Sequence, residues 1–315
     1  MKTTLSSCFK STKSIRCALS ILAASAALSC QGFAEQIVAD FTDGNSDAMV
    51  DGWYGKSGDG WATAWTRSSN GGTTESGTVQ STFSTGTKTD NPLTPSGEDY
   101  LRSKLKQVDG IAAWSSVVAR QYDQATIDFA RNHTVRFEFR LDSALDGLSK
   151  LMLFDGTEAN RDATAAEPTW YIHWEQGKDD FALYDGKTQV RSGVDLVAGE
   201  VYRFTIDIAP SPTAGQSTYS VVIENLTTAV TSEKFEGLHF YTDKSSVGGF
   251  LNFAGNVSTP IGSEFTFSLD SIHITAPELS SLSLIGAVAG AIWLLARRRR
   301  RGSLGRDPGK PSAKA

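Results

Sequence analysis

The sequence predicts an all-β protein, a two-sheet antiparallel β-sandwich of the jelly-roll type, with an apolar helix at each end of the chain. Apolar and polar residues alternate in many short runs, which is the period of a strand with one buried face. Turn residues separate the runs, for example at Asp185–Gly186 and Ala198–Gly199, as short antiparallel strands require. All three cysteines precede residue 31, so a packed core rather than disulfides must stabilise the rest.

The alternation is clearest in four runs: residues 135–142, 170–175, 202–208 and 219–224. Asp185–Gly186 lies between residues 181–184 and 188–190, and an Asp-Gly pair between apolar runs is the strongest local signal for a β-hairpin. Residues 123–131 have a pattern that suits a short helix, with a turn as the alternative.

The last apolar run changes parity part-way along. Its apolar residues are odd-numbered up to Leu269 and even-numbered from Ile272 onwards. A shift of one residue implies a β-bulge, because each residue added to a strand moves the following side chains to the other face. We therefore expect a bulge at Asp270.

The first 34 residues have the plan of a secretory signal peptide. Four basic residues and no acidic one accompany an uncharged apolar run, residues 17–30, which is too short for an ordinary membrane span. Gly32 and Ala34 place small residues at −3 and −1 of a cleavage site before Glu35. The alternatives are an uncleaved N-terminal anchor and a lipoprotein cut before Cys30.

The C-terminal end predicts a membrane-spanning helix. Residues 279–296 are 18 residues without a charge, and a helix of that length extends about 27 Å, close to the roughly 30 Å of a bilayer core. Five arginines follow at once: Arg297, Arg298, Arg299, Arg300 and Arg301. Because such a cluster resists translocation, we expect residues 302–315 to be a disordered cytoplasmic tail and residues 35–276 to lie outside the inner membrane.

Pro277-Glu278, a serine-containing stretch, an apolar helix and an arginine cluster together resemble the PEP-CTERM sorting tail of Gram-negative bacteria, over residues 277–301. The resemblance implies recognition by an exosortase, a membrane-embedded cysteine protease, and transfer to the cell surface or the extracellular polysaccharide matrix. The tail departs from the family pattern at Leu279, where proline is usual, and in the 14 residues that follow the arginines.

The charge of the predicted ectodomain, residues 35–276, limits its partners. Of the 30 basic and 35 acidic residues in the chain, 12 basic and 2 acidic ones lie in the terminal segments, which leaves 18 against 33 and a net charge of −15. A domain of this charge repels nucleic acid and acidic polymers. The order of its strands resembles concanavalin A-like and LamG-type sandwiches, with residues 201–225 as their central hairpin and residues 265–275 as their closing strand.

The candidate ligand-binding residues are four aromatic residues close together in the sequence: Trp53, Tyr54, Trp61 and Trp65. Trp and Tyr rings stack on the apolar faces of sugars, so the cluster predicts a glycan platform. The alternative is a lid packed on the core, because Trp buries a large area. We expect at least two of the rings to be buried.

The candidate cofactor is a structural Ca²⁺ held between the first and last strands. Asp40 and Asp43 follow the first strand and Asp270 lies at the expected bulge. Ca²⁺ takes several oxygen ligands, of which these carboxylates supply only part.

The sequence contains no recognised catalytic motif. Glycosidases need a pair of carboxylates flanking the substrate, and the nearest candidates are Glu138 with Asp142 and Glu175 with Asp179. Alternation places Glu138 and Asp142 on a solvated strand face. His173 shares a face with Glu175, and it also is expected at the surface.

These observations predict an exported, surface- or matrix-directed protein that is not an enzyme and that binds glycan, sorted by its C-terminal tail. Its expected partners are the membrane, an exosortase-type protease and extracellular polysaccharide, with no nucleic acid. Two alternatives stay open, a divergent glycan-active enzyme on the same fold and a structural envelope protein without a ligand.

Overall fold

The structure is a computed structural model that describes residues 36–39, 41, 50–51, 60–69, 79–86, 91–93, 100–107, 114–143, 148–242, 248–257 and 264–276. Within these residues all regular structure is β-strand, which confirms the predicted fold class. Residues 35–276 form one compact unit. The predicted signal helix, the membrane helix and the tail beyond it lie outside the described residues.

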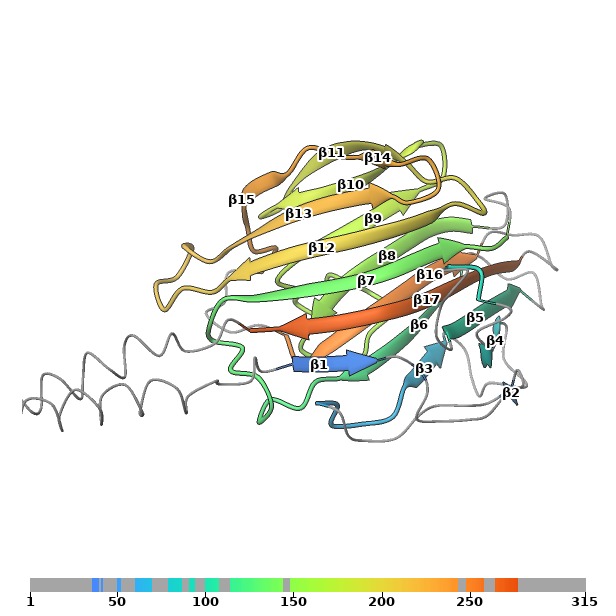
Figure 1. The fold of residues 1–315 in the computed structure, drawn as a ribbon, viewed down its shortest axis with the longest axis horizontal. Helices are drawn as coiled ribbons and strands as arrows, with labels where there is room; N and C mark the ends of the chain where they lie inside the picture. Colours follow the sequence, from blue (N-terminus) through green and yellow to red (C-terminus); the bar gives the residue numbers. More distant parts are fainter. Residues whose placement is uncertain are drawn as a thin grey trace, which may run out of the picture. The chain divides into compact units, whose positions relative to one another are not determined.

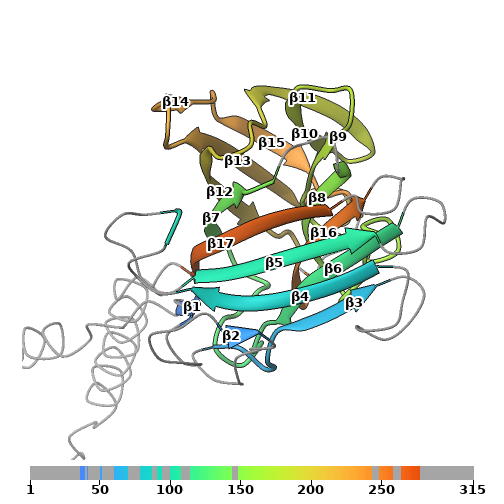
Figure 2. The same ribbon diagram turned by 90° about the vertical axis from the view of Figure 1, so that its right-hand side faces the viewer.

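Ten of the described strands form the first sheet. They are β1 (Gln36–Ala39), β2 (Val50–Asp51), β4 (Val79–Gly86), β5 (Tyr100–Gln107), β7 (His133–Leu141), β12 (Val201–Ala209), β13 (Thr218–Asn225), β14 (Val230–Thr231), β15 (Phe235–His239) and β17 (Glu264–Thr275). Their order is β14-β13-β12-β7-β17-β5-β4-β2, with β1 paired to β17 and β15 paired to β13. Figure 2 shows β17, β5 and β4 side by side.

Seven described strands form the second sheet. They are β3 (Thr66–Ser69), β6 (Trp114–Gln121), β8 (Leu148–Gly156), β9 (Tyr171–Glu175), β10 (Asp180–Asp185), β11 (Thr188–Asp195) and β16 (Phe250–Val257). Their order is β11-β10-β9-β8-β16-β6-β3. Figure 1 shows β12, β7 and β17 of the first sheet in front of β9, β8 and β16 of the second. The two layers make a sandwich, as the sequence predicts.

The core lies between the facing sides of the two sheets. Alternate residues of β7 are fully buried there, and β12 and β17 contribute their own buried sets. The ring of Phe137 stacks on Phe204 of the neighbouring strand at 5.0 Å between ring centroids and meets Phe253 of the opposite sheet edge-on at 5.2 Å. Edge-to-face and offset-stacked rings are the favoured geometries of aromatic pairs, so these contacts join the sheets directly.

Both predicted hairpins are confirmed. β12 and β13 pair along their whole length, from Tyr202 opposite Asn225 to Ala209 opposite Thr218. β10 and β11 pair up to Asp185 opposite Thr188, so Gly186 and Lys187 are the two turn residues. Gly186 has φ of 56°, which a tight two-residue hairpin turn requires and glycine adopts without a steric penalty.

The predicted bulge is also confirmed. The register between β17 and β7 shifts between Asp270 and His273, and Ser271 has φ of 52°. Before the shift β17 pairs with β5, and after it β17 pairs with β1. The extra residue therefore keeps both the odd-numbered and the even-numbered apolar sets in the same core.

Residues 123–131 form turns and no helix. The carboxylate of Asp123 accepts a hydrogen bond from the Ala125 N–H at 3.0 Å, and that of Asp128 accepts one from the Ala130 N–H at 3.0 Å. Aspartate side chains that bond the backbone two residues on favour turns over helix. The turn is thus the correct one of the two alternatives.

Trp61 and Trp65 belong to the core, each 2% exposed. The Trp61 N–H donates to the Val38 carbonyl at 2.8 Å, and the two rings are 6.0 Å apart. The guanidinium carbon of buried Arg120 lies 4.7 Å from the Trp61 ring centroid and 5.7 Å from that of Trp65. A cation held over indole faces in this way stabilises both partners.

We predict that Trp65→Ala lowers the free energy of unfolding by about 3–5 kcal/mol, because it leaves a cavity among Trp61, Phe41 and Phe253. Urea unfolding followed by circular dichroism measures the change. The control Val230→Ala, at a position 55% exposed, should alter stability by no more than about 0.5 kcal/mol. Equal effects of the two substitutions would show that the Trp65 ring is not buried.

Candidate functional site

The described part of the predicted glycan platform is not a surface. Trp61 and Trp65 are buried, which agrees with the alternative of a lid packed on the core. The prediction that a sugar stacks on their faces is therefore wrong. The two indoles are buried because each packs against other aromatic rings and the guanidinium of Arg120 lies over both of them. Trp53 and Tyr54 lie outside the described residues.

Asp270 has a structural role at the bulge. Its carboxylate accepts a hydrogen bond from the side-chain amide of Asn91 at 2.7 Å and one from the Ser271 N–H at 2.6 Å. Asp40 and Asp43 lie outside the described residues, and among those described there is no group of three residues suited to hold a metal ion. The Ca²⁺ site stays a prediction.

Two residues expected at the surface are buried. Glu138 is 2% exposed and accepts hydrogen bonds from Arg203 at 2.7 and 3.2 Å. His173 is 1% exposed. Both lie on the outward-facing side of their strands, where a period of two predicts solvent, but neighbouring side chains cover them. Glu175, by contrast, is on that same outer side and has a side chain 43% exposed.

His173 lies under a layer of polar side chains on the outer face of the second sheet. The side-chain amide of Gln189 is 2.9 Å from its Nε2, and Glu175 is 3.6 Å from the same atom. Its Nδ1 has no hydrogen-bond partner. Burial lowers the pKa of His173 to about 4, with Lys150 and Arg191 acting in the same direction and Glu175 against them. The ring is therefore neutral at physiological pH.

Tyr171 and Tyr184 pack beside His173, and Tyr241 packs against both of them. Tyr171 and Tyr184 stack at 4.8 Å with planes 7° apart, and both meet Tyr241 edge-on. The Lys187 ammonium lies 3.4 Å from the centroid of the Tyr241 ring. Tyr171 and Tyr241 are buried, and Tyr184 is partly exposed. This cluster is a small second core on the outer face rather than an open platform.

Asp155 is a buried carboxylate that holds the segment after β8. It accepts hydrogen bonds from the backbone N–H groups of Thr169 and Trp170 at 2.8 and 3.1 Å and from the Thr169 hydroxyl. Burial raises its pKa to about 6 despite these hydrogen bonds. All of these interactions are internal, so we assign Asp155 to the fold rather than to a site.

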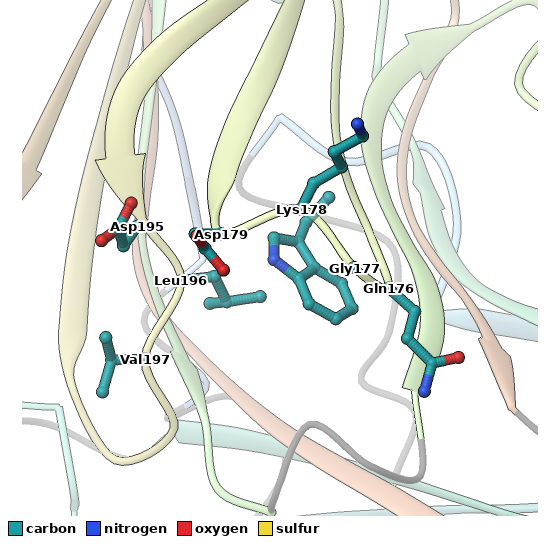
Figure 3. Close-up of a pocket in the computed structure, with 8 residues that line it drawn as sticks. Gln176, Gly177, Lys178, Asp179, Asp195, Leu196 and Val197 are labelled. Atoms are coloured by element: carbon teal, nitrogen blue, oxygen red, sulfur yellow. The ribbon is translucent and has the colours of Figure 1, made fainter.

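A pocket of about 380 Å³ opens at the end of the second sheet, beside the turn that joins β9 to β10 and the segment after β11 (Figure 3). This volume is near the lower end of the range for small-ligand sites, about 300–1,000 Å³. Its lining residues are Trp174, Gln176, Gly177, Lys178, Asp179, Asp195, Leu196 and Val197. The Leu196 N–H donates to the Asp179 carbonyl at 2.9 Å and so joins the two segments.

The pocket combines an apolar wall with unengaged polar side chains. Trp174 and Leu196 are buried and Val197 is 42% exposed. The side chains of Gln176, Lys178, Asp179 and Asp195 are exposed and make no hydrogen bond or ion pair with any described residue. The indole N–H of Trp174 is buried and has no hydrogen-bond partner among the described residues. An indole beside uncommitted donors and acceptors suits a ligand with both an apolar face and hydroxyl groups.

The sequence contained a partial signal for this pocket. Alternation places Trp174 inward on the last inward position of its strand, and the Gln176-Gly177-Lys178-Asp179 turn follows directly. Sequence spacing alone suggests for Asp179 only a pairing with Glu175 as catalytic carboxylates. The contribution of residues 195–197 depends on the pairing of β10 with β11, which no local pattern specifies.

The sorting-tail residues Pro277, Glu278 and Arg297–Arg301 lie outside the described residues. The part of the chain that the structure describes has no helix long and apolar enough to cross a membrane.

No family model and no curated protein matches the sequence. Among solved structures the chain is similar to an alginate lyase from Aplysia kurodai, with 9% identity, 61% of this chain and 87% of that chain covered and a TM-score of 0.42. It is also similar to lectin I from Ulex europaeus, with 9% identity, coverage of 67% and 97% and a TM-score of 0.39. A carbohydrate esterase of bacteriophage phi24B has 13% identity, coverage of 67% and 90% and a TM-score of 0.38. Similarities of this size support no inference about activity.

We predict a specific dependence of stability on pH from His173. Its folded-state pKa of about 4 lies below the 6.5 of an unfolded histidine, so the unfolded chain takes up the proton first as the pH falls. Stability from this group is complete above pH 6.5 and is lost between about pH 6.5 and 4, by at most about 3 kcal/mol.

Urea unfolding at several pH values measures this loss. His173→Gln should remove that part of the decline, whereas His239→Gln, at a ring 57% exposed, should retain it. If the wild type and His173→Gln decline in parallel, the His173 ring is not buried in the neutral form.

Proposed function

We propose that this protein is an exported, surface- or matrix-directed glycan-binding protein whose combining site is the pocket at Trp174. The observation that supports it most is the set of exposed, unengaged polar side chains around a buried indole. A sugar ring has an apolar face and hydroxyl groups around its edge, which match the exposed Val197 and the unengaged polar side chains of this pocket. The pocket offers complementary groups for both.

The pocket at Trp174 takes the place of the platform predicted at Trp61 and Trp65. The indole of Trp174 closes the end of the core, and the polar turn from Gln176 to Asp179 stands beside it. Hydrogen bonds to a ligand cost little here, because these side chains give up only water and no internal partner.

Binding is favoured over catalysis by the state of the candidate catalytic groups. Glu138 is buried in an ion pair with Arg203, and His173 is covered by Gln189 and its neighbours. A general acid or base must come within hydrogen-bond reach of the substrate. Glu175 and Asp179 are accessible, but Glu175 pairs with Lys150 at 3.3 Å.

Export and sorting rest on the ends of the chain. The basic and apolar leader, the uncharged segment 279–296 and the five arginines after it support secretion, a transient membrane anchor and recognition by an exosortase. In this proposal residues 35–276 meet extracellular polysaccharide. A domain stabilised without disulfides suits that location regardless of redox state.

We predict that Asp195→Ala weakens binding about tenfold on a glycan array of neutral, amino and acidic oligosaccharides, because it removes an acceptor at the rim. Its matched control is Glu233→Ala, which removes another exposed carboxylate without a partner. Both variants should unfold within about 0.5 kcal/mol of the wild type. Loss of binding in the control alone, or binding in neither the wild type nor the variants, would contradict the assignment.

We predict that alkaline phosphatase fused after Ala276 is active in Gram-negative cells, because that enzyme is active only outside the inner membrane. A second fusion after residue 315 should be inactive, since the arginine cluster retains the C-terminus in the cytoplasm. An inactive first fusion would refute the topology.

A further inference from the structure

The two carboxylates that line the pocket, Asp179 and Asp195, differ from the neighbouring Asp180 in their hydrogen bonding. Asp180 follows Asp179 directly and is fully engaged, accepting hydrogen bonds from Arg191 Nε at 2.8 Å and from the Gly193 N–H at 2.9 Å. Asp179 and Asp195 have neither kind of partner within the described residues. Asp179 and Asp195 both line the pocket, so two unneutralised carboxylates flank one cavity.

Lys178 does not neutralise them. Figure 3 shows its side chain extending away from Asp179 and Asp195, and it forms no ion pair with any described carboxylate. Arg191 of the neighbouring strand is already bound to Asp180. The pocket therefore presents acceptors and negative charge to whatever enters it.

Trp174 supplies the second, independent feature. It is 3% exposed, lines the pocket and has an indole N–H without a partner among the described residues. A buried donor left unpaired is costly. Trp174 and the two carboxylates together therefore suit a ligand that has an ammonium group for the anionic rim and a hydroxyl oxygen near the indole.

We infer that the pocket selects an amino sugar, one whose free amine is protonated, over neutral and acidic sugars. This rests on the proposed glycan-binding role of the pocket and names the class of sugar. The ammonium donates to Asp179 and Asp195, and the apolar face of the ring lies against the exposed side chain of Val197. Uronic acids are disfavoured because their carboxylate would approach two like charges.

The experiment uses the full chain in a detergent without a sugar headgroup, and three probes with the same ring and different charge: glucosamine, glucose and glucuronate. Isothermal titration calorimetry should give glucosamine about a tenfold tighter Kd than glucose, and glucuronate about a tenfold weaker one, since charge-assisted hydrogen bonds are the stronger kind. The isosteric double variant Asp179→Asn, Asp195→Asn should reduce the preference for glucosamine to less than about twofold. The control Glu233→Gln should keep it.

The results test the preference for amino sugars separately from glycan binding by the pocket. Binding of all three sugars without preference, or a preference for glucuronate, overturns the inference and leaves the glycan-binding role intact. Ethanolamine bound as tightly as glucosamine also overturns the inference, because the site then takes any amine. Binding of none of these probes, in a chain shown by circular dichroism to be folded, contradicts both.

Discussion

The aromatic packing around Phe137 is the contact on which the two-layer structure depends. Its ring stacks on Phe204 in one sheet, meets Phe253 of the other edge-on, and lies 6.4 Å from Trp170. With every cysteine confined to the first 30 residues, no disulfide is available to residues 35–276. Apolar burial must therefore supply the stability. Each strand that reaches this core needs its apolar residues on one face, and that requirement makes a period of two visible in the sequence.

That dependence explains which parts of the fold could be predicted. The hairpin of β12 and β13 and the parity change at Asp270 both follow from the rule that inward positions are apolar, and both are confirmed. The bulge could be located to one residue because a strand that kept its parity would have turned Ile272 and Ile274 to solvent. The sequence alone does not distinguish a helix from a turn at residues 123–131, because the deciding hydrogen bonds come from aspartates, which are also common at helix starts.

The outer faces could not be predicted, since alternation tells only that a residue points outward and not what covers it. His173 is buried by Gln189 from a strand two positions away in the sheet and by the tyrosines beside it. Glu138 is buried with Arg203 of the next strand. Trp61 and Trp65 were ambiguous for the same reason, because Arg120, which covers their faces, comes from β6. Such contacts depend on tertiary neighbours and leave no local period.

The candidate site arises where the core ends. Trp174 obeys the inward parity of β9, yet it is the last inward residue of that strand, so its neighbours beyond are the polar turn and the segment after β11 rather than another core layer. The packed Trp174 ring holds the pocket in one conformation before a ligand binds. The polar side chains beside it still have free hydrogen-bonding groups for that ligand. The rule that buries Phe137 at the centre of the sheet also places Trp174 at its end, where one side of the ring faces the core and the other side borders the pocket. The carboxylates of Asp179 and Asp195 give that pocket its negative charge.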